Sequence, residues 1–121
     1  MDKFRVIIAG GRDFDDYEFL RKSCDICFRN KKPYAIICGE ARGADKLGKR
    51  YAEEHSIEVF SFVPEWDLFG KAAGYIRNEE MAQNADALVA FWDGHSRGTR
   101  HMIETAQRYG LKIRVFRYDK R

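Results

Sequence analysis

The chain has 121 residues, of which 45% are hydrophobic and 34% charged, and it carries a net charge of +3. This length and composition indicate one globular domain over residues 1–121 and exclude a disordered or fibrous chain. No stretch approaches the roughly 18 apolar residues of a membrane-spanning helix, and the three cysteines cannot all pair, so we expect a cytoplasmic protein with no membrane contact.

Five apolar, β-branched or aromatic runs recur at the spacing expected when each strand is followed by a returning helix. The first, second and fourth runs are almost continuously apolar, which is typical of strands covered on both faces. The pattern therefore predicts a parallel sheet. The five predicted strands are residues 4–9, 34–38, 57–62, 87–92 and 112–118.

The segments between these runs have helical periodicity, with apolar side chains at steps of three and four. Asp15 or Asp16 is suited to cap the first helix, and Gly110 is placed where the last helix should end. Residues 64–70 form a long irregular connection, and such loops in compact domains are often functional. The predicted helices lie near residues 17–28, 44–55, 72–84 and 102–109.

These elements predict an α/β fold. We expect a three-layer Rossmann-like sandwich with right-handed crossovers around a five-stranded parallel sheet in the order 3-2-1-4-5. In such open sheets a ligand binds beyond the carboxyl ends of the strands.

Glycines and arginines are concentrated where three of the predicted strands end. Residues 10–13, 39–45 and 93–99 contain six of the ten glycines and three arginines. Glycine lets backbone N–H groups approach an anion, and the N-terminus of the following helix adds partial positive charge. We therefore expect a phosphate-bearing ligand here, although glycine is also common in strand-to-helix turns for structural reasons alone.

Two familiar nucleotide-binding fingerprints do not fit this sequence. Residues 10–14 read GGRDF, which is not G-x-G-x-x-G, and residues 39–46 read GEARGADK, which is not a Walker A sequence. These departures argue against an NAD-dependent dehydrogenase and against a P-loop NTPase.

Four motifs resemble those of a known family. They are IAGGRDF, GEARGAD, PEWDLFGKAAGYIRNEEM and SRGT, at residues 8–14, 39–45, 64–81 and 96–99. The chain resembles the small YspA-like, cpYpsA-related branch of the SLOG superfamily, which includes the LOG phosphoribohydrolases and the DNA-processing protein DprA. The resemblance covers nearly the whole chain, and it implies a Rossmann-like fold, a nucleotide or nucleotide-derived ligand and a tendency to form homodimers or larger homo-oligomers.

The resemblance to the LOG enzymes is incomplete at their catalytic pair. Arg77, followed four residues later by Met81, is similar to the arginine of that pair. The glutamate expected two or three residues after the Gly-Thr motif is absent, because His101 and Met102 occupy those positions. Glu104 is a poor substitute, since it lies about 140° away from Thr99 around a helix. Whether the chain catalyses a reaction, and through which residues, therefore stays open.

The predicted ligand-binding set joins the glycine loops to charged and polar neighbours. In the resemblance, Gly98 and Thr99 match a phosphate-binding Gly-Thr motif, and four earlier glycines match the first two loops. Arg77 could contact the ligand or form a structural salt bridge to a nearby carboxylate of Asp13, Glu40 or Asp45. The full predicted set is Gly10, Gly11, Arg12, Gly39, Gly43, Asp45, Lys71, Arg77, Asn78, Ser96, Arg97, Gly98 and Thr99.

Several of these residues have a second interpretation. Arg12 and Arg97 can bind phosphate bidentately or be solvated at the surface. Lys71 opens the third predicted helix, where a cation opposes the helix dipole, and this placement favours a ligand contact. Asp45, like Asp13, could hold a ribose hydroxyl or Mg²⁺, or could simply be a helix-start or turn residue.

Trp66 and the cysteines also have two interpretations. Trp66, in the irregular loop, could stack on a base or plug the loop. Cys24 and Cys27 fall on the buried stripe of the first helix and lack a second Cys or His pair, so we expect core packing and no metal site.

The sequence is compatible with three functions. The first is binding of a small nucleotide-derived molecule by a sensor or regulatory module. The second is an N-glycosidic hydrolase acting on nucleoside monophosphates, with Arg77 and a carboxylate such as that of Glu40. The third is DprA-like binding of single-stranded DNA, suggested by the net charge of +6 in residues 95–121. Charged edge strands also prevent aggregation, so we do not expect nucleic acid to be the main partner.

Overall fold

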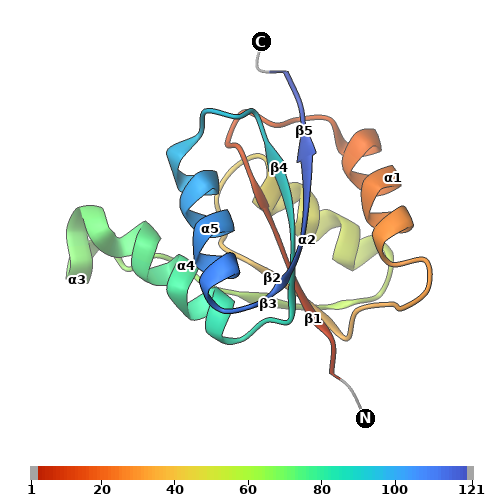
Figure 1. Cartoon of the computed structure of the whole chain (residues 1–121), viewed down its shortest axis with the longest axis horizontal. Helices are drawn as coiled ribbons and strands as arrows, with labels where there is room; N and C mark the ends of the chain where they lie inside the picture. The colour runs from red at the N-terminus through yellow and green to blue at the C-terminus, as the bar shows by residue number, and fades with distance from the viewer. Residues whose placement is uncertain (1–2, 120–121) are drawn as a thin grey trace.

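The computed structural model describes residues 3–119. Strands and helices alternate along the chain, apart from a short helix and a 3₁₀ turn before the fourth helix (Figure 1). The elements are β1 (Arg5–Gly10), α1 (Tyr17–Cys27), β2 (Ala35–Cys38), α2 (Ala44–Glu54), β3 (Glu58–Ser61), α3 (Trp66–Phe69), η1 (Gly70–Ala72), α4 (Ala73–Gln83), β4 (Ala87–Trp92), α5 (Arg97–Arg108) and β5 (Lys112–Arg117).

The five strands form one parallel sheet in the order β3-β2-β1-β4-β5, which confirms the predicted topology. β1 lies at the centre, where Ile7 pairs with Ile37 of β2 on one side and with Leu88 of β4 on the other. Because the chain moves outward first to one side and then to the other, the loops after β1, β2 and β4 meet at one edge of the sheet.

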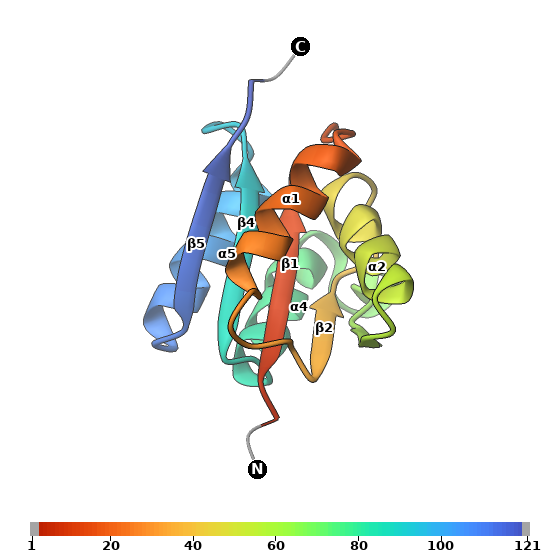
Figure 2. The same cartoon turned by 90° about the vertical axis from the view of Figure 1, so that its right-hand side faces the viewer.

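Alternation along each strand divides the interior into two apolar layers. Val6 and Ile8 of β1 pack toward α1 and α2, in a cluster that includes Leu20 and Tyr51. Ile7 faces the opposite side, where the cluster includes Met81 of α4 and residues of α5. Figure 2 shows the sheet between these two helical layers. The resulting three-layer α/β sandwich is Rossmann-like.

The ends of the helices follow local sequence signals. Asp16 caps α1, because its side chain accepts a hydrogen bond from the backbone N–H of Phe19 at 3.0 Å. Gly110 follows the end of α5 with a φ of 72°, as expected of a residue that ends a helix. Cys24 is buried in the α1-side core and its thiol is free, in agreement with a packing role.

The connection between β3 and α4 differs from the prediction. In place of an irregular segment over residues 64–70, Trp66–Phe69 form the short helix α3 and Gly70–Ala72 a 3₁₀ turn. α3 projects away from the sheet (Figure 1), and none of its residues is buried. The sequence did not reveal α3, because a helix without a buried face has no periodic pattern of apolar residues.

Within the part of the chain that the structure describes, no helix has both the length and the apolar character needed to span a bilayer. Lys120 and Arg121, which belong to the predicted basic tail, lie outside the described residues.

Candidate functional site

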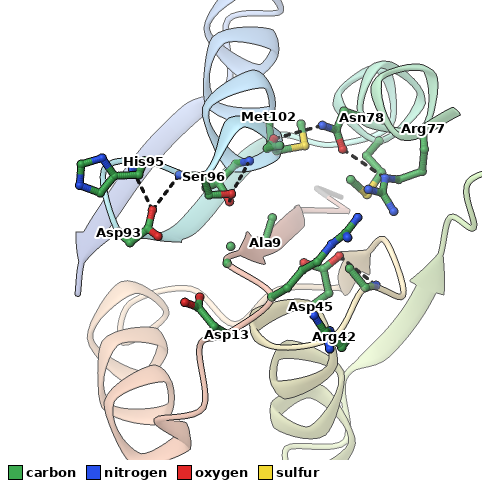
Figure 3. Close-up of a pocket in the computed structure, with 17 residues that line it drawn as sticks. Ala9, Asp13, Arg42, Asp45, Arg77, Asn78, Asp93, His95, Ser96 and Met102 are labelled. Carbon is green, nitrogen blue, oxygen red and sulfur yellow. Dashed lines mark hydrogen bonds between the residues drawn. The ribbon is translucent and has the colours of Figure 1, made fainter. Parts of the chain in front are cut away.

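A pocket of about 490 Å³ lies beyond the carboxyl ends of β1, β2 and β4. The loops after β1 and β2 form one wall, and α4 with the start of α5 forms the other (Figure 3). Nine of the thirteen predicted site residues line this pocket: Gly10, Gly11, Arg12, Asp45, Arg77, Asn78, Ser96, Gly98 and Thr99. The topology thus brings together side chains that are far apart in sequence.

Arg77 extends from α4 across the pocket to the loop after β2. Its Nη1 group donates a hydrogen bond to the carbonyl oxygen of Gly39, and its Nε group donates to Oδ1 of Asn78 at 3.1 Å. Burial lowers the pKa of Arg77, and the charge of Arg12 lowers it further, whereas the Asp45 carboxylate raises it. An arginine is still protonated at neutral pH, so Arg77 brings a partly desolvated positive charge to the pocket.

Asn78 holds Arg77 and the start of α5 in place. It is 4% exposed, and its Nδ2 group lies 3.1 Å from Nδ1 of His101 and 3.5 Å from the carbonyl oxygen of Gly98. The Asn78 side chain therefore connects the guanidinium of α4 to the last glycine loop, a structural contribution that accompanies any contact with a ligand.

The charged side chains of the pocket differ in whether the protein supplies them with a partner. Tyr118 donates a hydrogen bond to Asp13 at 2.8 Å, and the carboxylate of Asp93 accepts two backbone hydrogen bonds. Arg12 and Arg42 are exposed at the rim, and neither side chain has an ion-pair partner among residues 3–119. Because the carboxylates already have donors, the guanidinium groups are the ones left to attract an anion.

Asp45, in the first turn of α2, is a buried carboxyl group in the wall of the pocket. It is 4% exposed, and burial raises its pKa to about 6 even though Arg77 and backbone N–H groups lower it. The backbone N–H of Ala41 donates to its Oδ2 atom at 3.4 Å. The alternative interpretation of Arg77, a structural salt bridge to Asp13, Glu40 or Asp45, does not hold among the described residues. The guanidinium donates to the Gly39 carbonyl, and the Asp45 carboxylate only raises its pKa from nearby.

This burial predicts an unusual pH dependence of stability. The folded pKa of about 6 exceeds the usual value for aspartate, so Asp45 favours folding at low pH and loses that contribution as pH rises through 6. Relative to Asp45→Asn, the parent protein should lose roughly 2 kcal/mol of folding free energy between pH 4 and pH 8. Urea denaturation of both proteins at these two pH values measures the change. A difference in stability that is independent of pH would contradict the assigned burial.

The last glycine loop presents the N-terminus of α5 to the pocket. Asp93 fixes the loop by accepting hydrogen bonds from the backbone N–H groups of His95 and Ser96, both at 2.8 Å. Ser96 is the N-cap, with its Oγ atom 3.1 Å from Oγ1 of Thr99. A Cβ atom built at Gly98 meets nothing within 4 Å, so the pocket is open at this residue. The backbone N–H of Thr99 donates to Oγ of Ser96 at 3.4 Å, so the N–H groups of Arg97 and Gly98 are the ones left for an anion.

Two predicted glycines have packing roles. A Cβ atom at Gly39 would overlap Nη1 of Arg77, so this glycine makes room for the guanidinium. Gly43 has a φ of 78°, and a Cβ atom there would overlap the carbonyl oxygen of Gly11. Neither residue lines the main pocket. Without side chains at these two positions, the loop after β2 can approach both the loop after β1 and the side chain of Arg77, which shapes the site.

Two of the predicted cations lie elsewhere. Lys71 is in the 3₁₀ turn before α4, rather than at the start of that helix, and Arg97 is the first residue of α5. Both side chains are exposed, and neither lines the pocket.

Several lining residues were missing from the predicted set. Arg42 occupies the loop after β2, just as Arg12 occupies the loop after β1, and this equivalence was the available signal. Asp93 follows β4 directly and was recognisable by the same rule. His95, Met81 and Met102 also line the pocket, together with Ala9, Asp13 and Ala41.

The position of the glutamate expected from the LOG enzymes is filled differently. Met102 lines the pocket with an apolar side chain, whereas His101 stacks on Tyr75 of α4 at a ring distance of 4.2 Å. Glu40 does not line this pocket, and its carboxylate lies 3.6 Å from Nζ of Lys49. Among residues 3–119, no group of three or more His, Cys, Asp or Glu side chains is placed to hold a metal ion. Binding of Mg²⁺ together with a ligand phosphate stays a prediction.

The basic residues of β5 are partly tied to the fold. Arg117 packs over the ring of Trp92 and donates a hydrogen bond to the carbonyl oxygen of Asp93 at 3.4 Å. Arg114 lies over the ring of Phe116. These contacts account for two of the cations that had suggested nucleic-acid binding.

Comparisons with known proteins give one family and one relative. The family described as YAcAr, "YspA, cpYpsA-related SLOG family", matches residues 4–69, which include the loops after β1 and β2. The "Gene 61 protein" of Mycobacterium phage D29 is 36% identical over 116 residues, covering 90% of this chain and 93% of the relative. No solved structure matches the chain significantly.

Proposed function

The chain belongs to the YspA, cpYpsA-related SLOG family, and from this premise we propose that it binds a nucleotide or a nucleotide-derived molecule, as a sensor or regulatory module. The observation that carries the proposal is that Arg12 and Arg77 line one pocket and that neither guanidinium group has an ion-pair partner among the described residues. Two neighbouring guanidinium groups repel each other, and a phosphate between them relieves the repulsion.

The size and polarity of the pocket support the same conclusion. A cavity of about 490 Å³ is within the range of small-molecule sites. Its arginines and the N-terminus of α5 suit a phosphate group, while Ala9, Met81 and Met102 provide an apolar surface for a sugar or base. We place a ribose hydroxyl of the ligand beside Asp45, whose carboxyl group lines the same pocket.

Gly98→Asp tests the proposed phosphate position. The substitution should be tolerated by the fold, because a Cβ atom at this residue meets nothing within 4 Å and an acidic side chain suits the first turn of a helix. The added carboxylate should repel a phosphate and reduce the affinity for nucleotides by at least about tenfold. Calorimetric titration with AMP, GTP, NAD, ADP-ribose and cyclic nucleotides measures the effect.

Gly98→Ala is the matched control, since it adds a side chain without a charge. The parent protein and the alanine variant should bind the same ligand with similar affinity. Failure of the parent to bind any of these compounds would overturn the proposed function, and equal binding by Gly98→Asp would overturn the assigned phosphate position.

One observation favours a second candidate, the N-glycosidic hydrolase. Asp45 is buried beside Arg77, and its pKa of about 6 lies near neutrality, as required of a general acid that protonates a departing base. Asp45, rather than Glu40, is therefore the carboxyl group suited to replace the missing glutamate. Release of free base from nucleoside monophosphates by the parent, and not by Asp45→Asn, distinguishes hydrolysis from binding alone.

A further inference from the structure

A second cavity adjoins the pocket described above. It has a volume of about 330 Å³ and lies between the loop after β2 and the segment that leads into α3. The two cavities share four lining residues: Arg12, Ala41, Arg42 and Arg77. Three of these four are arginines, so a ligand that extends from one cavity into the other must pass three guanidinium groups.

The far wall of the second cavity is apolar and contains Val63, Pro64 and Trp66. Trp66 is 51% exposed and belongs to neither of the two apolar clusters formed by the described residues. The ring lies over Gly74 of α4, where a Cβ atom would be 3.7 Å from Cη2. This environment does not fit a core plug. It places a large aromatic surface at the wall of a cavity.

The charges at the junction of the cavities are predominantly positive. Glu40 also lines the second cavity, but its carboxylate is paired with Lys49 at 3.6 Å. Arg12 and Arg42 are exposed, and no ion-pair partner meets either of them within residues 3–119. Guanidinium groups arranged in this way bind phosphate oxygens bidentately, and a diphosphate offers more such oxygens than a monophosphate.

We propose that the ligand is a dinucleotide-like molecule, a nucleoside diphosphate joined to a second nucleoside, whose diphosphate lies between Arg12, Arg42 and Arg77. One nucleoside occupies the main pocket, and the base of the other stacks on Trp66 in the second cavity. The inference rests on the proposed function, because it extends the same phosphate site. It explains why an exposed tryptophan and two exposed arginines line a cavity that shares its arginines with the main pocket.

The test compares AMP with diadenosine diphosphate, which carries a second phosphate and a second adenosine. Diadenosine diphosphate is symmetric, so either orientation places an adenine on Trp66, whereas AMP fits within the main pocket. The parent should bind diadenosine diphosphate at least about tenfold more tightly than AMP, as one stacked base contributes. In Trp66→Ala the affinity for diadenosine diphosphate should fall by at least about tenfold, which leaves only the contribution of the second phosphate, while the affinity for AMP should change less than about twofold. Trp66→Phe should retain most of the advantage.

Leu68→Ala is the matched control. Leu68 lies in the same short helix and is 68% exposed, but it lines neither cavity. Its substitution should leave both affinities unchanged. Equal affinity of the parent for the two ligands, or a loss in Trp66→Ala that is the same for both, would overturn the two-part ligand and leave the proposed function standing. Absence of binding of both ligands to the parent, with no binding of any compound in the titration above, would overturn the proposed function itself.

Discussion

Arg77→Ala should reduce the affinity for nucleotides by about a hundredfold or more, because it removes a partly buried charge whose hydrogen bonds to phosphate are worth several kcal/mol. The guanidinium is held in place by the Gly39 carbonyl and by Asn78. A ligand therefore meets a group that is already oriented, and little entropy is lost on binding. Arg77→Lys should keep part of the affinity, since it preserves the charge and loses the bidentate geometry.

Folding must be separated from binding in this experiment. Without Arg77, the carbonyl oxygen of Gly39 loses a donor, which should cost about 1 kcal/mol of folding free energy. A thermal denaturation curve for each variant shows whether it is folded under the conditions of the titration. Arg100→Ala is a suitable control, because Arg100 is exposed on α5, pairs with Glu104 at 3.4 Å and does not line the pocket. Equal affinities of Arg77→Ala and Arg100→Ala would contradict the assigned site.

Gly43→Ala should destabilise the fold by about 3 kcal/mol or more, through a steric clash added to backbone strain. The φ of 78° and ψ of −128° at this residue are accessible to glycine and unfavourable for alanine. A Cβ atom would lie 2.7 Å from the carbonyl carbon of Arg12. The obstacle is backbone, so it cannot rotate away as a side chain could. The loops after β1 and β2 would have to separate.

Gly98→Ala provides a control with the same chemical change at the same edge of the sheet. Gly98 lies in the first turn of α5, and a Cβ atom there meets nothing within 4 Å. This variant should be as stable as the parent or slightly more stable, by less than about 1 kcal/mol. Urea denaturation of both variants measures the difference. Similar midpoints for Gly43→Ala and the parent would show that the two loops do not meet as closely as described.

Much of the fold could be predicted from local patterns. The apolar runs of β1, β2 and β4 require cover on both faces, and this requirement identifies a parallel sheet without any knowledge of contacts. The stripe on α1 likewise predicted that Cys24 is buried, whereas Cys27 on the same stripe is only partly buried and the buried Ser23 was not predicted. The segment around α3 was the exception. It has no buried residue, and without a buried face the sequence carries no periodic signal.

The location of the candidate site could be predicted from the sequence, but only some of the residues that line it could. The rule that ligands bind beyond the carboxyl ends of parallel strands directed attention to the loops after β1, β2 and β4. It could not assign roles within them. Gly39 and Gly98 look alike in sequence, but the first makes room for Arg77 and the second faces open space. Lys71 and Arg97 carry the expected charge, and both side chains lie outside the pocket.

The sequence by itself determined the α/β class, because burial on one or two faces leaves a periodic pattern of apolar residues in the chain. The strand order and the edge at which the loops gather followed from the usual topology of alternating strands and helices. Tertiary structure alone decided that Arg77 reaches Gly39, that Asp45 is buried with a pKa of about 6, and that Trp66 borders a cavity beside Arg12 and Arg42. These contacts join residues tens of positions apart. They depend on which strand ends lie next to one another in the folded sheet, and the local pattern of apolar residues does not specify these neighbours.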